Sequence, residues 1–383
     1  MDYQTENLII GAGPAGLAMA GRLRKLGREF IVVERSQQIA DAWRNHYDRL
    51  HLHTVKDTSY LPHRPFPADY PKYVPRLKLV EYYDAYQQEM DIQPHFGQEV
   101  INVRREGELW RTETAQGHVY TSPHVIVCTG FNRTMHIPDW LGKDDYQGSI
   151  EHSRTYKNGQ PYAGQDVLVV GMGNTGAEIA LDLYEHGARP FISVRGPINI
   201  VPRDILGRPT QQTAMLLAKL PPNVGDAIGV LVRKFTVGDL SKYGLETSDI
   251  PPAAQLRLYG KTPVIDVGTL AQIKVGTIKI LPDIERFESD GLVFTDGKKR
   301  TFDHIVLATG YRAHIEKFIE NGEQLLNELG HPGVLCGEGT FAGLYLLGFD
   351  AYSTGGLLYS IYNQSAEIVA RIAAATTEGH KVS

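Results

Sequence analysis

The chain has 383 residues, of which 42% are hydrophobic and 22% charged, and its formal net charge is −5. This is the composition of a globular protein long enough for more than one domain, and it excludes a nucleic-acid or anionic-membrane partner recognised through basic charge. The two cysteines, Cys128 and Cys336, are isolated and form no CxxC pair. No apolar run reaches the roughly 20 residues that span a bilayer, and no signal peptide precedes the first apolar segment. We therefore expect a cytoplasmic protein with no metal site, no membrane span and no nucleic-acid partner.

The first predicted strand, Asn7–Ile10, runs directly into a glycine-rich turn, and a helix-like stretch follows. The pattern GxGxxG between a strand and a helix is typical of a dinucleotide-binding turn. Its glycines permit the tight turn and let a pyrophosphate approach the backbone at the positive end of the helix. The residues of this turn that we expect to bind a nucleotide are Gly11, Gly13, Pro14, Ala15 and Gly16.

The identity of the first nucleotide depends on the end of the next predicted strand, Phe30–Val33. This strand ends at Glu34, 23 positions after Gly11. A carboxylate there accepts hydrogen bonds from a free ribose hydroxyl, as FAD and NAD both carry. The first site therefore suits FAD, and we include the neighbouring Arg35 in it.

A second fingerprint begins 160 residues after the first, again behind an apolar run, Val167–Val170. Its predicted binding residues are Gly171, Gly173, Asn174, Thr175 and Gly176. The following strand ends at Arg195, 24 positions after Gly171, where a guanidinium can hold a 2′-phosphate in bidentate fashion. This favours NADPH. The alternative for Arg195 is an ordinary solvated strand end, and tolerance of both nicotinamides stays open.

Three further apolar runs end in glycine, at Val125–Gly130, Ile305–Gly310 and Leu344–Gly348. The first two share an apolar run followed by Thr-Gly-aromatic, and we interpret them as turns that return the chain from one nucleotide domain to the other. The predicted fold class is α/β with two dinucleotide-binding (Rossmann-like) domains, the NADPH domain inserted into the FAD domain. The predicted ranges are 1–155 and 281–383 for the FAD domain and 156–280 for the NADPH domain.

Residues 205–260 carry apolar stretches broken by the pairs Pro221-Pro222 and Pro251-Pro252, which predicts short helices. A lid, a wall of a substrate channel, a subunit interface and plain core packing all remain open for them, as does the oligomeric state. The polar tail after Ala375 is expected to fray.

Between the two fingerprints, the stretch Tyr146–Lys157 resembles the signature F-x-G-x-x-x-H-x-x-x-Y-K of the flavin-containing monooxygenases, with Tyr146 in place of the first Phe. Baeyer–Villiger monooxygenases have a similar stretch that ends in Trp, so the Tyr156-Lys157 ending favours the flavin-containing branch. The resemblance implies that His152 positions the linker between domains and performs no chemistry.

Further segments are similar to the YUCCA-type members of this class B family. They are 47–53, 65–67, 201–204, 260–269 and 308–312. The resemblance implies an enzyme that uses FAD, NADPH and O₂, forms a C4a-(hydro)peroxyflavin and oxidatively decarboxylates a small aromatic 2-oxo acid such as indole-3-pyruvate to indole-3-acetate. N- or S-oxygenation of small amines and sulfides, or an NADPH oxidase that produces H₂O₂, are the alternatives. A pyridine-nucleotide disulfide reductase needs a redox cysteine pair, which this sequence lacks.

The resemblance also places single residues. His53 stands where many relatives have an Asn near the flavin, and we expect it beside the reacting oxygen as the candidate catalytic residue; packing against the flavin is the alternative. A neutral His can donate one hydrogen bond as Asn does. The other predicted flavin contacts are Trp43, Thr129, Gly130, Gly348 and Asp350. Asp350 departs from the family pattern because Phe349 separates it from Gly348.

Overall fold

Two parallel sheets organise the chain, and each lies in its own compact unit. The computed structural model describes residues 1–379. Unit 1 comprises residues 1–44, 54–134 and the part from 311 onward, while unit 2 comprises residues 45–53 and 135–310. The chain therefore passes between the units four times.

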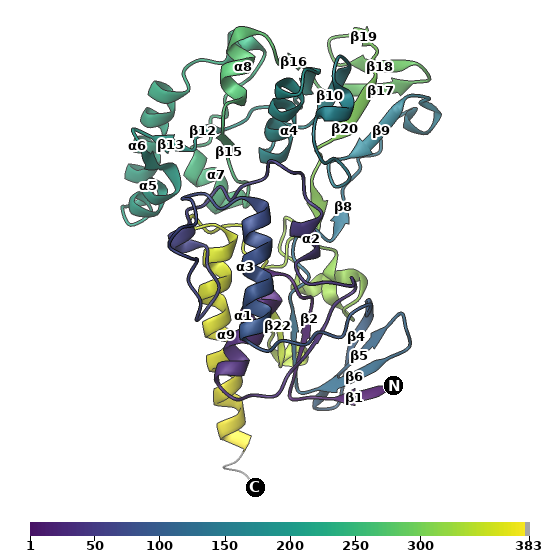
Figure 1. Ribbon diagram of the computed structural model, residues 1–383, viewed down its shortest axis with the longest axis vertical. Helices are drawn as coiled ribbons and strands as arrows, with labels where there is room; N and C mark the ends of the chain where they lie inside the picture. The colour runs from purple at the N-terminus through teal and green to yellow at the C-terminus, as the bar shows by residue number, and fades with distance from the viewer. Residues whose placement is uncertain (380–383) are drawn as a thin grey trace. The chain divides into compact units, whose positions relative to one another are not determined.

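The central sheet of unit 1 has the strand order β22-β7-β2-β3, and all its pairs are parallel. Figure 1 labels two of its strands, β2 and β22. Its strands are β2 (Asn7–Ile10), β3 (Ile31–Val33), β7 (His124–Val127) and β22 (Leu344–Leu346). These short runs are almost wholly apolar and buried, as strands covered on both faces must be.

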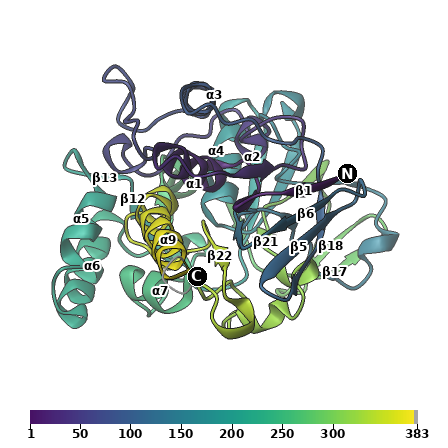
Figure 2. The same ribbon diagram turned by 90° about the horizontal axis from the view of Figure 1, so that it is seen from below.

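Helix α1 (Pro14–Lys25) connects β2 to β3, and Pro14 stands in its first turn, where a missing N–H costs nothing. Figure 2 shows α9 (Leu357–Gly379) lying alongside α1. Helix α3 (Arg76–Glu89) packs against α1 so closely that a Cβ on Gly21 would lie 2.0 Å from the Tyr86 hydroxyl. Residues 380–383, the end of the tail expected to fray, lie outside the described residues.

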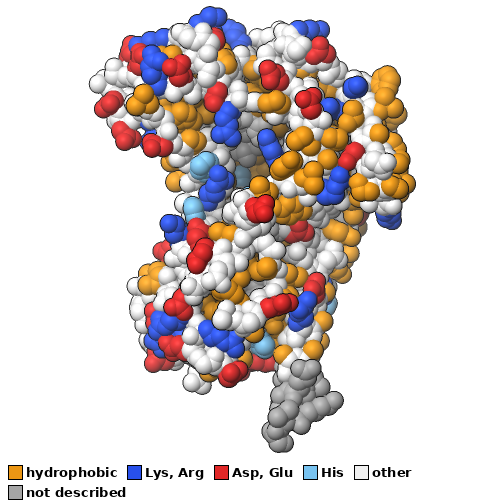
Figure 3. Space-filling view, turned by 180° about the vertical axis from the view of Figure 1, so that it is seen from behind, with side chains coloured by type: hydrophobic (Ala, Val, Ile, Leu, Met, Phe, Trp, Pro, Cys, Tyr) orange, Lys and Arg blue, Asp and Glu red, His pale blue; other side chains and the backbone are white. Residues whose placement is uncertain are grey.

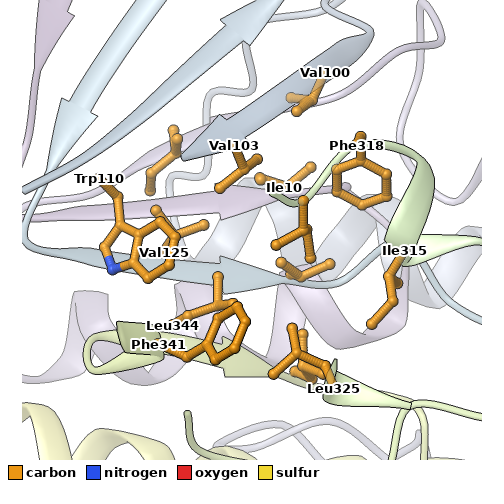
Figure 4. Packing of buried hydrophobic residues seen from close by; sticks show 14 of the residues in the cluster. Ile10, Val100, Val103, Trp110, Val125, Ile315, Phe318, Leu325, Phe341 and Leu344 are labelled. Carbon is orange, nitrogen blue, oxygen red and sulfur yellow. The ribbon is translucent and has the colours of Figure 1, made fainter. Parts of the chain in front are cut away.

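A second sheet in unit 1 packs against one face of the parallel sheet. Its order is β1-β6-β5-β4, with strands β1 (Asp2–Gln4), β4 (Val100–Glu106), β5 (Leu109–Thr114) and β6 (Val119–Ser122). Trp110 and Val103 of this sheet pack with Ile10, Val125 and Leu344 of the parallel sheet in one buried cluster (Figure 4). This core joins the two sheets of unit 1 along the length of the parallel strands.

Unit 2 is built on a five-stranded parallel sheet with the order β16-β11-β10-β20-β9. Its strands are β9 (Ser149–His152), β10 (Asp166–Val170), β11 (Arg189–Ser193), β16 (Lys279–Leu281) and β20 (His304–Leu307). Helix α4 (Asn174–Glu185) connects β10 to β11, as α1 connects β2 to β3. The antiparallel strands β17 (Ile284–Glu288) and β18 (Gly291–Phe294) pack their apolar side chains against this sheet, and β19 (Lys299–Arg300) pairs with β18.

The helices predicted within residues 205–260 are present: α5 (Thr210–Leu217), α6 (Pro222–Thr236) and α7 (Pro252–Tyr259). Helix α6 exposes Val224, Ile228, Leu231 and Phe235, which recur at helical spacing along one stripe. In Figure 3 hydrophobic side chains gather over α5 and α6 at the right-hand edge. Since Phe235 is 83% exposed, this stripe is no part of the core of unit 2.

The boundaries of the units differ from the predicted ranges. The chain leaves unit 1 after residue 134 and returns after residue 310, so residues 135–155 and 281–310 lie in unit 2 and not with the first fingerprint. The reason is that β9 and β20 pair with each other and with β10. The sequence of a short, buried parallel strand does not indicate which of two parallel sheets the strand will join.

The longest helices are α9 and α6. Within residues 1–379, no helix combines the length and the apolar character needed to cross a membrane.

Candidate functional site

The turn between β2 and α1 can be made only by glycine at two positions. Gly11 has φ +105°, and its N–H donates to the Val33 carbonyl at 2.8 Å. A Cβ on Gly16 would lie 1.9 Å from the Gly11 carbonyl oxygen, which is backbone and cannot yield. These contacts bring the helix start against the strand end, as a dinucleotide-binding turn requires.

Gly13, by contrast, faces open space. A Cβ there would meet no atom within 4 Å, and no side chain caps the N-terminus of α1. The first backbone N–H groups of a helix have no partner within the helix, and they carry its positive partial charge. The turn therefore offers an uncovered anion-binding position at Gly13, Ala15 and Gly16, which fits a pyrophosphate.

Side chains from the neighbouring strand ends surround this position. Glu34, at the end of β3, accepts a hydrogen bond from the Ala12 N–H at 2.7 Å, so its carboxylate lies against the turn. The Thr129 hydroxyl oxygen, after β7, is buried and has no hydrogen-bond partner. Gly348, after β22, has φ +90°, and its Cβ would lie 3.0 Å from that of Ala15. An unpaired buried hydroxyl and a close glycine at the carboxyl edge of one sheet fit a bound dinucleotide.

The remaining residues predicted for this site are Asp350, Arg35, Trp43 and Gly130. Both oxygens of Asp350 are used within the chain, by the Tyr352 N–H at 2.9 Å and the Ser360 hydroxyl at 2.6 Å. Asp350 thus braces the start of α9 and has less capacity left for a ligand than the family pattern implies. Arg35 is exposed beyond β3, Trp43 is half-buried on α2 (Asp41–Arg44), and Gly130 has φ +69° after Thr129.

The turn between β10 and α4 in unit 2 has nearly the same geometry as the first turn. Gly171 has φ +100° and donates to the Ser193 carbonyl at 3.0 Å. A Cβ on Gly176 would lie 2.0 Å from the Gly171 oxygen, while a Cβ on Gly173 would meet no atom within 4 Å. No side chain caps α4. The second turn therefore offers the same uncovered anion-binding position as the first.

Two side chains of the second turn serve the protein itself. Asn174 accepts a hydrogen bond from the Ile265 N–H at 2.7 Å and donates to the Pro263 carbonyl at 3.4 Å, so it ties β15 (Val264–Asp266) to the start of α4. Thr175 is hydrogen-bonded to the Tyr47 hydroxyl. These contacts use part of the hydrogen-bonding capacity of both side chains. Arg195 is exposed and lies two residues beyond the end of β11 at Ser193.

The segment 45–53 comes from the N-terminal part of the sequence but packs on α4 in unit 2. Nε2 of His53 lies 2.7 Å from a carboxylate oxygen of Glu178, whose side chain is 5% exposed. The Tyr47 hydroxyl is hydrogen-bonded to the same carboxylate, and burial followed by the nearby Glu178 raises the pKa of Tyr47 well above its usual value. Sequence reasoning missed Glu178 and Tyr47, because an acid two residues after a glycine turn resembles any solvent-facing helical residue.

Asp182, one turn further along α4, holds the Tyr156-Lys157 end of the motif. Its carboxylate accepts from the Tyr156 hydroxyl at 2.6 Å and from the Gly159 N–H at 2.7 Å. The Lys157 carbonyl in turn accepts from the Asp48 N–H at 2.8 Å. The motif thus anchors segment 45–53, a role that its sequence alone does not reveal.

The imidazole of His152 accepts from the Arg154 N–H through Nδ1 at 3.2 Å and donates through Nε2 to the Gly310 carbonyl at 3.1 Å. Gly310 is the last residue of unit 2 before the chain returns to unit 1. His152 therefore holds one end of a connection between units and is occupied at both ring nitrogens, which agrees with the structural role expected for it.

Comparisons with known proteins agree with this architecture. A family model described as pyridine nucleotide-disulphide oxidoreductase matches residues 8–202. A flavin-containing monooxygenase from Stenotrophomonas maltophilia has a TM-score of 0.74 at 21% identity, covering 98% of this chain and 99% of that one. An OTEMO structure in complex with FAD and NADP has a TM-score of 0.75 at 16% identity, covering 98% and 86%. The fold is that of the class B flavin monooxygenases.

The sequence of the indole-3-pyruvate monooxygenase YUCCA8 from Oryza sativa subsp. indica is 37% identical over 384 aligned residues, covering 95% of this chain and 90% of the relative. The chain belongs to the YUCCA-type family of flavin-containing monooxygenases, and it is a flavin-dependent monooxygenase. The predicted family is thereby confirmed. Although the matching family model includes disulphide oxidoreductases, Cys128 and Cys336 are both free thiols.

Proposed function

We propose that this enzyme oxidatively decarboxylates an aromatic 2-oxo acid, with indole-3-pyruvate as the first candidate and indole-3-acetate as its product. The observation that carries the proposal is the match to indole-3-pyruvate monooxygenases over 95% of the chain, together with two uncovered glycine turns of the same geometry. The overall change consumes NADPH, H⁺ and O₂ and yields CO₂, NADP⁺ and water. One oxygen atom enters the new carboxylate and the other leaves as water.

FAD belongs at the first turn and NADPH at the second, so unit 1 is the FAD domain and unit 2 the NADPH domain inserted into it. When bound, the flavin passes reducing equivalents from NADPH to O₂. The protein supplies the position and the electrostatics. At the first turn the N–H groups of Gly13, Ala15 and Gly16 hold the pyrophosphate. Glu34 accepts from a ribose hydroxyl, and the unpaired Thr129 hydroxyl offers a further polar contact.

At the second turn Gly173 and Gly176 take the pyrophosphate of NADPH in the same way. Arg195 supports a choice of NADPH because it lies exposed beyond β11, where the carboxylate stands in unit 1. The substrate and O₂ are then the small molecules that the reaction consumes.

The function is tested by following NADPH consumption in the FAD-loaded enzyme with indole-3-pyruvate, alongside indole-3-acetate and H₂O₂. We expect about one indole-3-acetate for each NADPH and little peroxide. Peroxide equal to the NADPH consumed, with no acid formed, would contradict the proposed substrate. In that case a panel of sulfides and amines would separate N- or S-oxygenation from a plain NADPH oxidase.

His53 is proposed to stabilise the reacting oxygen, so we expect His53→Ala to lower product per NADPH and raise H₂O₂ severalfold. The variant loses one hydrogen bond, worth about 1 kcal/mol, to the reacting oxygen. More of the oxygen is then released as H₂O₂ before it can react with the substrate. The matched control is His51→Ala, since His51 lies two residues earlier in segment 45–53 and is exposed. Equal coupling in both variants would remove His53 from the chemistry.

A further inference from the structure

Segment 45–53 is held on α4 by two buried carboxylates one helical turn apart. Glu178 and Asp182 are each 4% exposed. Asp182 contacts the Tyr156 hydroxyl, the Gly159 N–H and, at 4.0 Å, the Arg49 guanidinium. Glu178 contacts Tyr47 and His53. Burying a carboxylate is costly unless donors surround it, so each of these acids implies a specific set of partners.

The contact of Glu178 with His53 uses only one of the two ring nitrogens. Nε2 lies 2.7 Å from Oε1 of Glu178, which is ion-pair distance, although the two atoms are not aligned for a hydrogen bond. Nδ1 of His53 is buried and has no hydrogen-bond partner. A buried ring nitrogen without a partner in the chain is able to take a hydrogen bond from a bound group.

Tyr47 fixes the carboxylate from the other side. Its side chain is almost fully buried, and its hydroxyl is hydrogen-bonded to Glu178 and to Thr175 of the second glycine turn. An ionised carboxylate can only accept hydrogen bonds, so Tyr47 donates to it, and the 2.7 Å approach of Nε2 is favourable only if that nitrogen carries a proton. The proton of a neutral His53 is thereby assigned to Nε2.

We propose that Glu178 is a positioning residue for His53. It accepts the Nε2 proton, fixes the imidazole in one tautomer, and leaves Nδ1 as a hydrogen-bond acceptor for a donor group of the bound cofactor or substrate, such as a hydroxyl or an N–H. This rests on the proposed function, since it assumes that His53 faces the reacting ligands. The likeness to Asn led us to expect that neutral His53 donates a hydrogen bond to the ligand. Here Nδ1 of His53 accepts one from the ligand instead.

The direct test is the ring tautomer of His53, read from the ¹⁵N chemical shifts of histidine-labelled, FAD-loaded protein, with His53→Asn assigning the signal. We expect a proton on Nε2 and none on Nδ1 in the parent protein. In Glu178→Gln the side chain can donate as well as accept, so a population with the proton on Nδ1 is expected. Asp182→Asn is the matched control, because it removes an equally buried carboxylate from the same helix without touching His53, and we expect the Nε2–H tautomer to persist in it.

The second measurement is the amount of product formed for each NADPH consumed. Glu178→Gln is expected to raise H₂O₂ severalfold, and the double variant with His53→Ala should be no worse than His53→Ala alone, because the effect of Glu178 acts through His53. Additive losses in the double variant would contradict the proposal. So would a proton on Nδ1 in the parent protein, or a tautomer that Glu178→Gln and Asp182→Asn change alike.

The tautomer does not depend on which substrate is oxidised, so failure of the proposed function is recognisable separately. If indole-3-pyruvate is not consumed but the shifts change as expected, Glu178 positions His53 and only the substrate is wrong. If His53→Ala leaves the amount of product per NADPH unchanged, His53 has no catalytic role. That result would also contradict the inference that a ligand binds at Nδ1.

Discussion

Gly13→Ala is expected to yield a folded protein that has lost most of its flavin. Gly13 has φ −77° and ψ −172°, an extended conformation open to alanine, and its Cβ would meet no atom within 4 Å. The new methyl group would instead occupy the space through which a pyrophosphate approaches the N–H groups of α1. Loss of a hydrogen bond to a charged group costs about 1.5–3 kcal/mol, which corresponds to roughly a tenfold to hundredfold weaker affinity. The measurement is the FAD dissociation constant, with the far-UV circular dichroism spectrum as the test of folding.

The matched control for this variant is Gly173→Ala, since Gly173 has φ −85° and ψ −173° and faces equally open space. We expect it to keep its flavin and to raise the KM for NADPH by a similar factor. Gly13→Ala should therefore weaken FAD binding alone, and Gly173→Ala should weaken NADPH binding alone. If Gly13→Ala weakened NADPH and spared the flavin, the assignment of the two turns would be reversed.

Arg195→Gln is expected to raise the KM for NADPH about tenfold to hundredfold while leaving the KM for NADH nearly unchanged. The two cofactors differ only in the 2′-phosphate, and a charge-assisted guanidinium–phosphate contact contributes about 1.5–3 kcal/mol. Steady-state kinetics with both nicotinamides measure the ratio of kcat/KM directly. Arg195→Gln should therefore remove most of the preference for NADPH.

Arg189→Gln provides the control at the opposite end of the same strand. Arg189 begins β11, is exposed and is paired with Asp166 at 2.5 Å, so it lies at the amino edge of the sheet, away from the glycine turn. We expect it to change neither KM. An equal rise of both KM values in Arg195→Gln would show that this residue acts on the strand end and does not recognise the 2′-phosphate.

The two glycine turns were predictable because their geometry depends on residues that are near in sequence. The carbonyl of Gly11 meets the position of a Cβ on Gly16 only five residues later, and the same holds for Gly171 and Gly176. Each turn thus carries its own steric requirement in its sequence. The helices within residues 205–260 followed from local signals of the same kind, proline pairs and apolar stretches.

The allocation of strands to units depended on the tertiary structure. The runs that became β20 and β22 are both short and mostly apolar, yet β20 joins β10 in unit 2 and β22 joins β7 in unit 1. Backbone pairing is possible for either strand in either sheet. The choice follows from which side chains fill the core, such as Ile305 and Leu307 beside Phe294.

The amino-acid sequence by itself determined the family and the geometry of the two glycine turns, because these features are short-range and chemically distinctive. Only the tertiary structure showed that segment 45–53 belongs to unit 2, and that the buried acids Glu178 and Asp182 hold it there. Glu178 and His53 are 125 positions apart in the chain. A polar contact over that distance leaves no periodic pattern in the sequence, since its partners are brought together by the packing of a helix and a loop that each form for other reasons.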